Sequence, residues 1–233
     1  MKHGPTEQRS VPKPGWLKRP LPSAPAFSRT RSLLDDGRLH TVCREARCPN
    51  CGECFSRGTA AFLILGDVCT RRCRFCAVTQ GKPQSPDPDE PRRVAEAALR
   101  MSLDYVVVTS VTRDDLADGG AGAFAETIRS VRSRRPSARV EVLVPDFQGD
   151  AEALRTVLEA RPDVLNHNLE TVARLYPEAR PQAIYDRSLE LLRRTGSLAP
   201  GMPVKSGLML GLGEQPEEIE STLRDLLEAG CRI

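Results

Sequence analysis

Seven of the eight cysteines lie between residues 43 and 76, and their spacing divides them into two groups. The second cysteine group has the spacing C-x3-C-x2-C and comprises Cys69, Cys73 and Cys76. Three thiolates on one short loop can hold three irons of a four-iron cluster, which leaves the fourth iron open to a ligand other than cysteine. We therefore expect this group to bind a cofactor at an open iron and to do chemistry there.

The first cysteine group has the spacing C-x4-C-x5-C and comprises Cys43, Cys48 and Cys54, with Cys51 as an extra thiol between the last two. The N-terminal residues contain no apolar segment of the kind that a secretory signal needs. Clustered cysteines in a chain without an export signal favour metal binding over disulfides. Both groups are therefore expected to hold metal.

Zinc is the alternative to iron and sulfur. The pairs Cys48-x2-Cys51 and Cys73-x2-Cys76 have the spacing of a four-thiolate zinc site. That interpretation leaves three of the seven clustered cysteines without a role. We therefore favour iron–sulfur clusters for the two groups.

Charge is unevenly distributed along the chain. The net charge is +3 over 233 residues, but residues 1–80 carry 14 Lys and Arg against 6 Asp and Glu. These basic residues are scattered among proline and cysteine with little aromatic interleaving, which argues against nucleic-acid binding. Compensation of anionic clusters and docking of an acidic partner are simpler explanations. No run of about 18 apolar residues occurs, so we expect a cytoplasmic protein without a membrane partner.

Short β-branched runs alternate with helical patterns from residue 60 onward, as in βαβ units around a parallel sheet. Strands are expected at 61–65, 105–109, 140–144, 164–167 and 204–210, and a sixth is expected to begin at 230–233. Helices are expected near 92–102, 121–134, 151–160, 184–195 and 216–229. Such a sheet is either a barrel segment or a doubly wound sheet.

Before the sheet, six prolines in residues 1–28 predict an extended arm. A short Arg-rich helix and the first cysteine loop are expected to follow in residues 29–58. The chain therefore divides into an N-terminal region over 1–58 and an α/β body over 59–233.

Polar side chains follow the ends of the expected strands. In barrels and open α/β sheets the active site lies at the carboxyl ends of the strands, so these residues are candidates for binding a cofactor or substrate. The candidates are Ser110, Arg113, Asp114, Asn168, Glu170 and Lys205. The first three lie where polar contacts to cofactor or substrate are expected. The next two could bind ribose hydroxyls or an amino group, and the lysine could meet a carboxylate. The alternative for each is a loop cap or a solvated charge.

Five stretches of the chain together resemble the lipoyl synthase family. They are HTVCREARCPNCGECFSRGTAAFLILGDVCTRRCRFCAV, VTSVTRDDLADGGA, VLVPDFQG, NHNLETVARLYPEARP and KSGLMLGLGE, in that order. The resemblance extends from about Trp16 to the C-terminus. It implies a radical S-adenosylmethionine enzyme with a partial (β/α)6 TIM-type barrel, preceded by an arm and an auxiliary-cluster loop.

The resemblance also implies two four-iron–four-sulfur clusters and S-adenosylmethionine as cofactors. The second cysteine group would hold the cluster at which S-adenosylmethionine is cleaved to a 5′-deoxyadenosyl radical. The first group, Cys51 excepted, would hold an auxiliary cluster that supplies sulfur. The implied reaction inserts two sulfur atoms at carbons six and eight of a protein-bound octanoyl group. Implied partners are an octanoylated carrier protein or lipoyl domain, and an electron donor such as flavodoxin or ferredoxin.

The sequence departs from the family in two places. Cys51 stands where the family usually has an aliphatic residue, and we expect it to be a spare thiol. The family also continues past the end of this chain to an Arg-Ser-Ser-Tyr motif that supplies a fourth ligand to the auxiliary cluster. We therefore expect a chain truncated at its C-terminus, just inside the sixth strand.

Two alternatives to this reaction remain open at the level of sequence. Biotin synthase is another radical enzyme with an auxiliary cluster, but the first cysteine group ahead of the barrel argues against it. The alternative from a different class is a non-catalytic iron–sulfur or zinc module.

Overall fold

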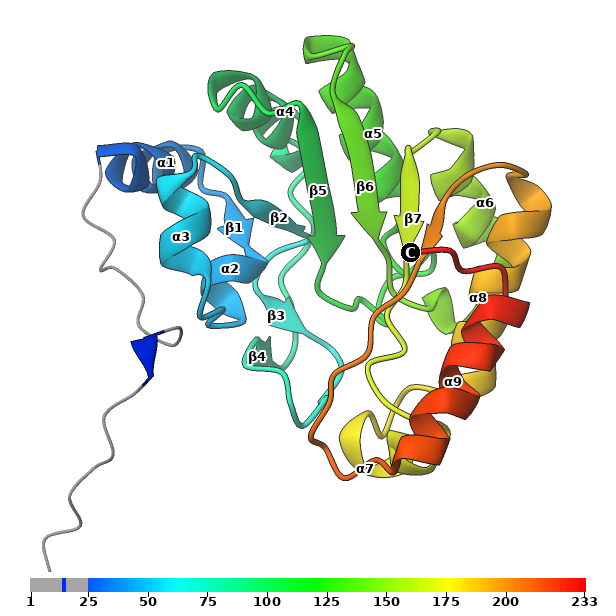
Figure 1. Cartoon of the computed structure of the whole chain (residues 1–233). Helices are drawn as coiled ribbons and strands as arrows, with labels where there is room; N and C mark the ends of the chain where they lie inside the picture. The colour runs from blue at the N-terminus through cyan, green and yellow to red at the C-terminus, as the bar shows by residue number, and fades with distance from the viewer. Residues whose placement is uncertain (1–13, 16–24) are drawn as a thin grey trace, which may run out of the picture.

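The computed structural model describes residues 14–15 and 25–233. Most of the proline-rich arm expected at the N-terminus therefore lies outside the described residues. The chain then forms α1 (Pro25–Asp36), β1 (His40–Thr41), α2 (Val42–Glu45) and α3 (Cys51–Ser56), as Figure 1 shows. The Arg-rich helix is confirmed as α1, although it begins earlier than expected. The first cysteine loop is partly helical, because Cys51 and Cys54 lie in α3.

Within the described residues, the main sheet has six strands in the order β1-β2-β5-β6-β7-β8. Its parallel strands are β2 (Ala61–Ile64), β5 (Tyr105–Ser110), β6 (Arg139–Leu143), β7 (Val164–Asn166) and β8 (Val204–Lys205), and β1 pairs with β2 in the antiparallel sense. The five expected strands and the parallel α/β sheet are thus confirmed. The last strand is shorter than the expected 204–210, because Leu208 leaves the ladder and bridges Glu170 beyond the end of β7.

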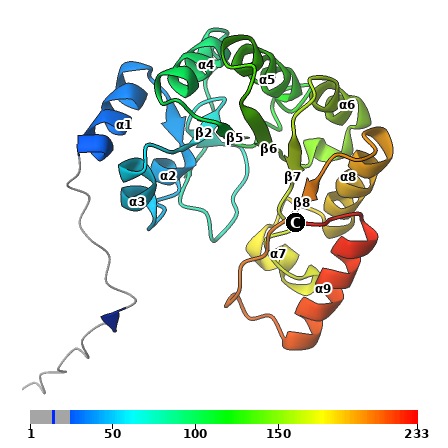
Figure 2. The ribbon, with the colours of Figure 1, turned by 45° about the horizontal axis from the view of Figure 1, so that its top comes forward.

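Helices cover the outer face of this sheet. They are α4 (Glu90–Arg100), α5 (Ala121–Arg134), α6 (Ala151–Glu159) and α8 (Tyr185–Leu198), and α9 (Pro216–Glu228) follows β8. All five expected helices are confirmed, with small displacements of their ends. Figure 2 shows that the strands follow an arc that the described residues do not close, so the fold is a partial barrel. Among the described helices, none combines the length and the apolar character needed to cross a membrane.

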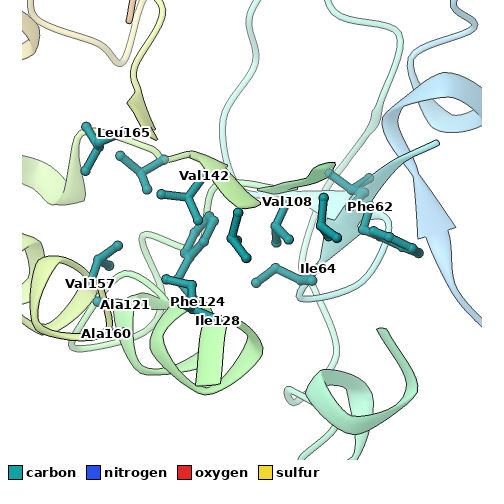
Figure 3. Packing of buried hydrophobic residues seen from close by; sticks show 14 of the residues in the cluster. Phe62, Ile64, Val108, Ala121, Phe124, Ile128, Val142, Val157, Ala160 and Leu165 are labelled. Carbon is teal, nitrogen blue, oxygen red and sulfur yellow. The ribbon is translucent and has the colours of Figure 1, made fainter. Parts of the chain in front are cut away.

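The core lies between the sheet and its helices. Alternate residues of β5 are buried on the helix side, where Val106 and Val108 are fully inaccessible. Figure 3 shows the side chains of Phe62, Val108 and Val142, from three neighbouring strands. They point to the face of the sheet against which Phe124 of α5 packs. These side chains fix the register of the strands, so the loops at the carboxyl ends of the strands are held at one edge.

Residues 230–233 run beside β8. The backbone N–H of Arg232 donates to Val204 O (3.0 Å), and the N–H of Ser206 donates to Ile233 O (3.1 Å). These two hydrogen bonds agree with the expected start of a sixth strand, although residues 230–233 do not form a regular strand.

Candidate active site

The second cysteine group begins soon after β2. The strand β3 (Val68–Cys69) pairs in parallel with β4 (Thr79–Gln80), and the loop between them carries Cys73 and Cys76. Cys69 therefore ends a two-residue strand, whereas the sequence predicted all three thiols on a loop. The backbone N–H groups of Arg71 and Thr112 donate to Cys69 Sγ at 3.4 and 3.3 Å. Donors directed at sulfur suit an iron–sulfur ligand, whose redox potential such hydrogen bonds adjust.

The three thiols lie within electrostatic range of one another. Burial raises the pKa of both Cys73 and Cys76, and the charge of Cys69 raises each further. Arg180 opposes the shift at Cys73 through its charge and a hydrogen bond. Buried thiols of this kind stay protonated unless a metal binds them, and coordination deprotonates a thiol outright. The residues present therefore fit a metal cluster.

Arg71, between Cys69 and Cys73, ties this loop to the sheet through buried ion pairs. Its side chain is 4% exposed, and its guanidinium donates to both carboxylate oxygens of Asp114 at 2.7 and 2.8 Å. It also donates to Asp146 Oδ1 at 2.6 Å. The two aspartates follow β5 and β6, so one guanidinium joins the thiol loop to the ends of two strands.

Asp146 is the buried centre of this network. Its side chain is fully inaccessible, and Arg187 of α8 donates to its second oxygen at 2.7 and 2.8 Å. Burial alone would raise the pKa of Asp146, but hydrogen bonds and charge from Arg71, together with the charge of Arg187, lower it to about 2. The carboxylate is therefore ionised at neutral pH and holds both arginines in place.

The other side of the loop contacts the chain that follows β7. The backbone N–H of Arg72 donates to Gln182 Oε1 (2.7 Å), and Gln182 Nε2 donates to Thr70 O (3.4 Å). The N–H of Arg74 donates to Ala179 O (2.9 Å). The loop is thus held from both sides, which restricts the positions of its thiols.

Asn168 and Glu170 lie beside the thiols, at the end of β7. Glu170 donates its N–H to Gly207 O (3.0 Å) and accepts from Met209 N (2.8 Å), which holds the segment after β7 against the segment after β8. Burial raises the pKa of Glu170, and a hydrogen bond from Asn168 partly offsets the shift. The charge of Glu170 acts in turn on Cys76. The structure therefore brings these two predicted residues to the second cysteine group.

Arg180 is a residue that the sequence reasoning missed. Its Nη1 donates to Asn168 O (2.9 Å) and Leu169 O (3.0 Å), and its guanidinium lies 5.4 Å from the ring centre of Tyr176. Its Nε is buried without a hydrogen-bond partner. A cation beside Cys73 with an unused donor suits an anionic ligand. Its place within the motif NHNLETVARLYPEARP was the available signal.

The remaining predicted residues differ in their surroundings. Ser110 Oγ is buried without a partner. Arg113 is buried and donates to Asp115 at 2.8 and 2.9 Å and to Leu65 O at 3.4 Å. Asp114 is occupied by Arg71, as described above. Lys205 pairs within the protein, where its Nζ donates to the carboxylate of Glu141 on β6 at 2.9 Å.

The first cysteine group lies at the β1 edge of the sheet, in and between α2 and α3 (Figure 1). Cys43 of α2 is 8% exposed, and Cys48, Cys51 and Cys54 are partly buried. Burial raises the pKa of Cys43, and the charges of the other three thiols raise it further. No disulfide joins any of the eight cysteines, all of which lie in described segments. Four thiols that share one space also fit a metal cluster.

Comparison with known proteins agrees with these features. The pattern of the Radical SAM superfamily matches residues 63–226. The chain is 55% identical to a lipoyl synthase of Desulfotalea psychrophila, over 99% of the chain and 77% of that protein. It is 56% identical to a lipoyl synthase of Rubrobacter xylanophilus, over 95% of the chain and 69% of that protein. The crystal structure of methylornithine synthase has a similar fold, with a TM-score of 0.58 at 15% identity over 89% of the chain and 62% of that protein.

Proposed function

The chain belongs to the lipoyl synthase family of the Radical SAM superfamily, and we propose that its two cysteine groups divide the family's reaction between them. The reaction is the S-adenosylmethionine-dependent insertion of two sulfur atoms into a protein-bound octanoyl group, at carbons six and eight. Its cofactors are S-adenosylmethionine and two four-iron–four-sulfur clusters. An unactivated methylene has no acidic proton for a base to remove, so the cofactors supply radical chemistry and the chain supplies binding and orientation.

The second cysteine group would hold the cluster that binds S-adenosylmethionine. The observation that carries this assignment is the thiol loop itself, which Arg71 fixes at the carboxyl ends of β5 and β6. Asn168 and Glu170 would take the amino group or ribose hydroxyls, and Arg180 would face the carboxylate. Ser110 would offer its unpartnered hydroxyl to cofactor or substrate.

Three of the predicted polar residues would act without direct contact to S-adenosylmethionine. Arg113 and Asp114 would position the segment that follows β5, since both are already paired within the protein. Lys205, paired with Glu141, is 35% exposed and would keep an ammonium group available on the sheet.

The first cysteine group would hold the auxiliary cluster, the source of sulfur, through Cys43, Cys48 and Cys54. We further propose that residues 1–58 form the arm and auxiliary-cluster region and that residues 59–233 form the radical body. The substrate would be an octanoylated carrier protein or lipoyl domain. Flavodoxin or ferredoxin would deliver electrons, in the cytoplasm and without nucleic acid or membrane as partner. Acidic partners of this kind suit the positive charge of residues 1–80.

Anaerobic reconstitution with iron and sulfide tests the proposal. We expect about eight irons and about eight sulfides per chain, as two four-iron clusters require. S-adenosylmethionine should change the electron paramagnetic resonance spectrum of the reduced protein, and an octanoyl-lysine peptide should be converted to the lipoyl product. One or two tightly bound zinc ions without iron would contradict the proposal and favour a non-catalytic metal module.

A further inference from the structure

The hydroxyl of Thr70 joins the thiol loop to the segment that follows β5. Thr70 is partly buried and lies directly after Cys69. Its Oγ1 donates to Thr112 O (3.0 Å) and accepts from the backbone N–H of Asp114 (3.1 Å). One hydroxyl therefore bridges both ends of residues 112–114, and it uses its donor and an acceptor site to do so.

The same segment directs a backbone N–H at the sulfur of an expected cluster ligand. Thr112 N donates to Cys69 Sγ at 3.3 Å. Thr70 N also donates to Thr112 O (3.1 Å), so the carbonyl of Thr112 accepts from both the backbone and the side chain of Thr70. Because two donors hold this carbonyl, Thr112 has little freedom to move, and its own N–H stays directed at the sulfur.

A hydrogen bond to a ligand sulfur favours the reduced state of an iron–sulfur cluster. One electron from the donor enters the cluster, with no bond made or broken, and its negative charge spreads onto the thiolate sulfurs. An N–H group binds the more negative sulfur more strongly, so it raises the reduction potential. Loss of such a hydrogen bond should therefore make the cluster harder to reduce.

We propose that Thr70 is a positioning residue that sets the reduction potential of the cluster at the second cysteine group. Its hydroxyl holds the N–H of Thr112 against Cys69 Sγ and so makes the cluster easier for the electron donor to reduce. The inference rests on the proposed function, because it concerns how readily the cluster that binds S-adenosylmethionine accepts its electron.

Potentiometric titration followed by electron paramagnetic resonance tests this role. The parent is the chain with Cys43, Cys48 and Cys54 replaced by Ala, which holds only the second cluster, with about four irons. In this parent, Thr70→Val keeps the shape of the side chain and the backbone hydrogen bond to Thr112 but loses the hydroxyl. At a fixed potential, we expect the ratio of reduced to oxidised cluster to fall about three- to tenfold, or about 30–60 mV for one electron. Thr70→Ser, which retains a hydroxyl, should keep the ratio of the parent.

Thr109→Val is the matched control. Thr109 Oγ1 donates to Leu143 O (3.0 Å), so this change also removes a hydroxyl hydrogen bond near the end of β5. The lost partner lies on β6 rather than in residues 112–114. Both Val variants should unfold at lower urea concentration than the parent, but only Thr70→Val should lower the reduction potential.

Two other outcomes of the titration separate the possible failures. A parent that holds four irons, with a potential that Thr70→Val leaves unchanged or lowers no more than Thr109→Val does, would overturn the inference while leaving the proposed function in place. A parent without iron would overturn both the proposed cluster and the inference.

Cofactor cleavage with two reductants gives an independent measurement in the chain with all its cysteines. With dithionite, Thr70→Val should form 5′-deoxyadenosine more slowly than the unmutated chain. The deficit should narrow with titanium(III) citrate, because a stronger reductant compensates for a lower cluster potential but not for a misplaced cofactor. A deficit of the same size with both reductants would show that Thr70 acts on cofactor placement and would contradict a role in the reduction potential.

Discussion

The two cysteine groups are positioned by contacts of different range. The second group depends on residues far along the chain, since Arg71 pairs with Asp114 and Asp146, and Arg72 bonds to Gln182. The first group depends on neighbours, since its turns are closed by hydrogen bonds between residues such as Cys43 and Cys48. The thiol loop of the second group is therefore fixed by strands and helices from across the barrel, whereas the first group rests on a local fold.

The difference has an energetic consequence. The contacts of the second group are buried charges, and removal of one partner leaves the other desolvated and unpaired. The contacts of the first group are turns and a helix cap, whose individual losses cost less. Substitutions in the two regions should therefore differ in how much they lower the free energy of unfolding and in how far from the substituted residue their effects extend.

Arg71→Met should have the largest effect on stability. It leaves Asp146 buried with one cationic partner fewer, at an expected cost of about 3–5 kcal/mol in the free energy of unfolding. Urea denaturation measures this cost. The matched control Arg72→Met removes an exposed side chain and should change the free energy of unfolding by less than about 0.5 kcal/mol. Equal effects at the two positions would contradict the ion-pair account.

His167 should make the barrel body sensitive to acid. Burial lowers the pKa of His167 to about 4, and the neutral ring bonds to Val144 O (2.8 Å) and Ser188 Oγ (2.9 Å). Since the unfolded chain binds this proton near pH 6.5, stability is present above that pH and is lost as pH falls toward 4. The expected loss is about 3 kcal/mol between pH 7 and pH 4.

The variant His167→Gln isolates this contribution. The difference in unfolding free energy between the chain and the variant should shrink as the pH falls, because only the chain has the buried histidine to protonate. His40→Gln, at a partly exposed histidine near the first cysteine group, serves as the control. If the difference in unfolding free energy between the chain and His167→Gln did not change with pH, His167 would not be the source of the acid sensitivity.

Thr41→Ala tests the local character of the first group. The change removes the cap of α2, with an expected cost of about 1 kcal/mol. We expect faster loss of auxiliary iron to a chelator, with no change in S-adenosylmethionine cleavage at the second group. Thr79→Ala, at an exposed threonine of β4, is the matched control. Loss of cleavage in Thr41→Ala would show that the two regions are coupled.

Arg74→Ala should have the smallest effect, although it lies inside the thiol loop. Its ion pair with Glu178 spans 3.3 Å, but both side chains are about two-thirds exposed. Exposed pairs contribute little, so the expected change is below about 0.5 kcal/mol. A loss as large as that of Arg71→Met, measured by the same denaturation, would show that loop charge rather than burial fixes the thiols.

Features encoded by neighbouring residues could be predicted from the sequence. The spacing of the cysteines is local, so both groups can be identified from the sequence alone. The β-branched runs gave the strands because each run pairs with a similar run, as Val106 pairs with Val140. The strand ends located Asn168 and Glu170, because parallel strands bring their carboxyl ends to one edge.

Features that depend on distant partners could not be predicted in this way. Arg71 looks like any other basic residue of its loop until Asp114 and Asp146 are brought beside it. Arg180 was missed for the same reason, since its partners are backbone carbonyls of a folded turn. The helix that begins at Cys51 was also missed, because the Pro, Asn and Gly around it are typical of a loop.

The most direct test of the roles of the two cysteine groups compares two variants, each with three cysteines of one group replaced by Ala. Mass spectrometry would measure 5′-deoxyadenosine and lipoyl product from the chain with Cys43, Cys48 and Cys54 replaced by Ala. The same products would be measured from the chain with Cys69, Cys73 and Cys76 replaced by Ala. The first variant should yield 5′-deoxyadenosine without lipoyl product, and the second should yield neither. Sulfur insertion by the first variant, or cofactor cleavage by the second, would contradict the assignment of the two groups.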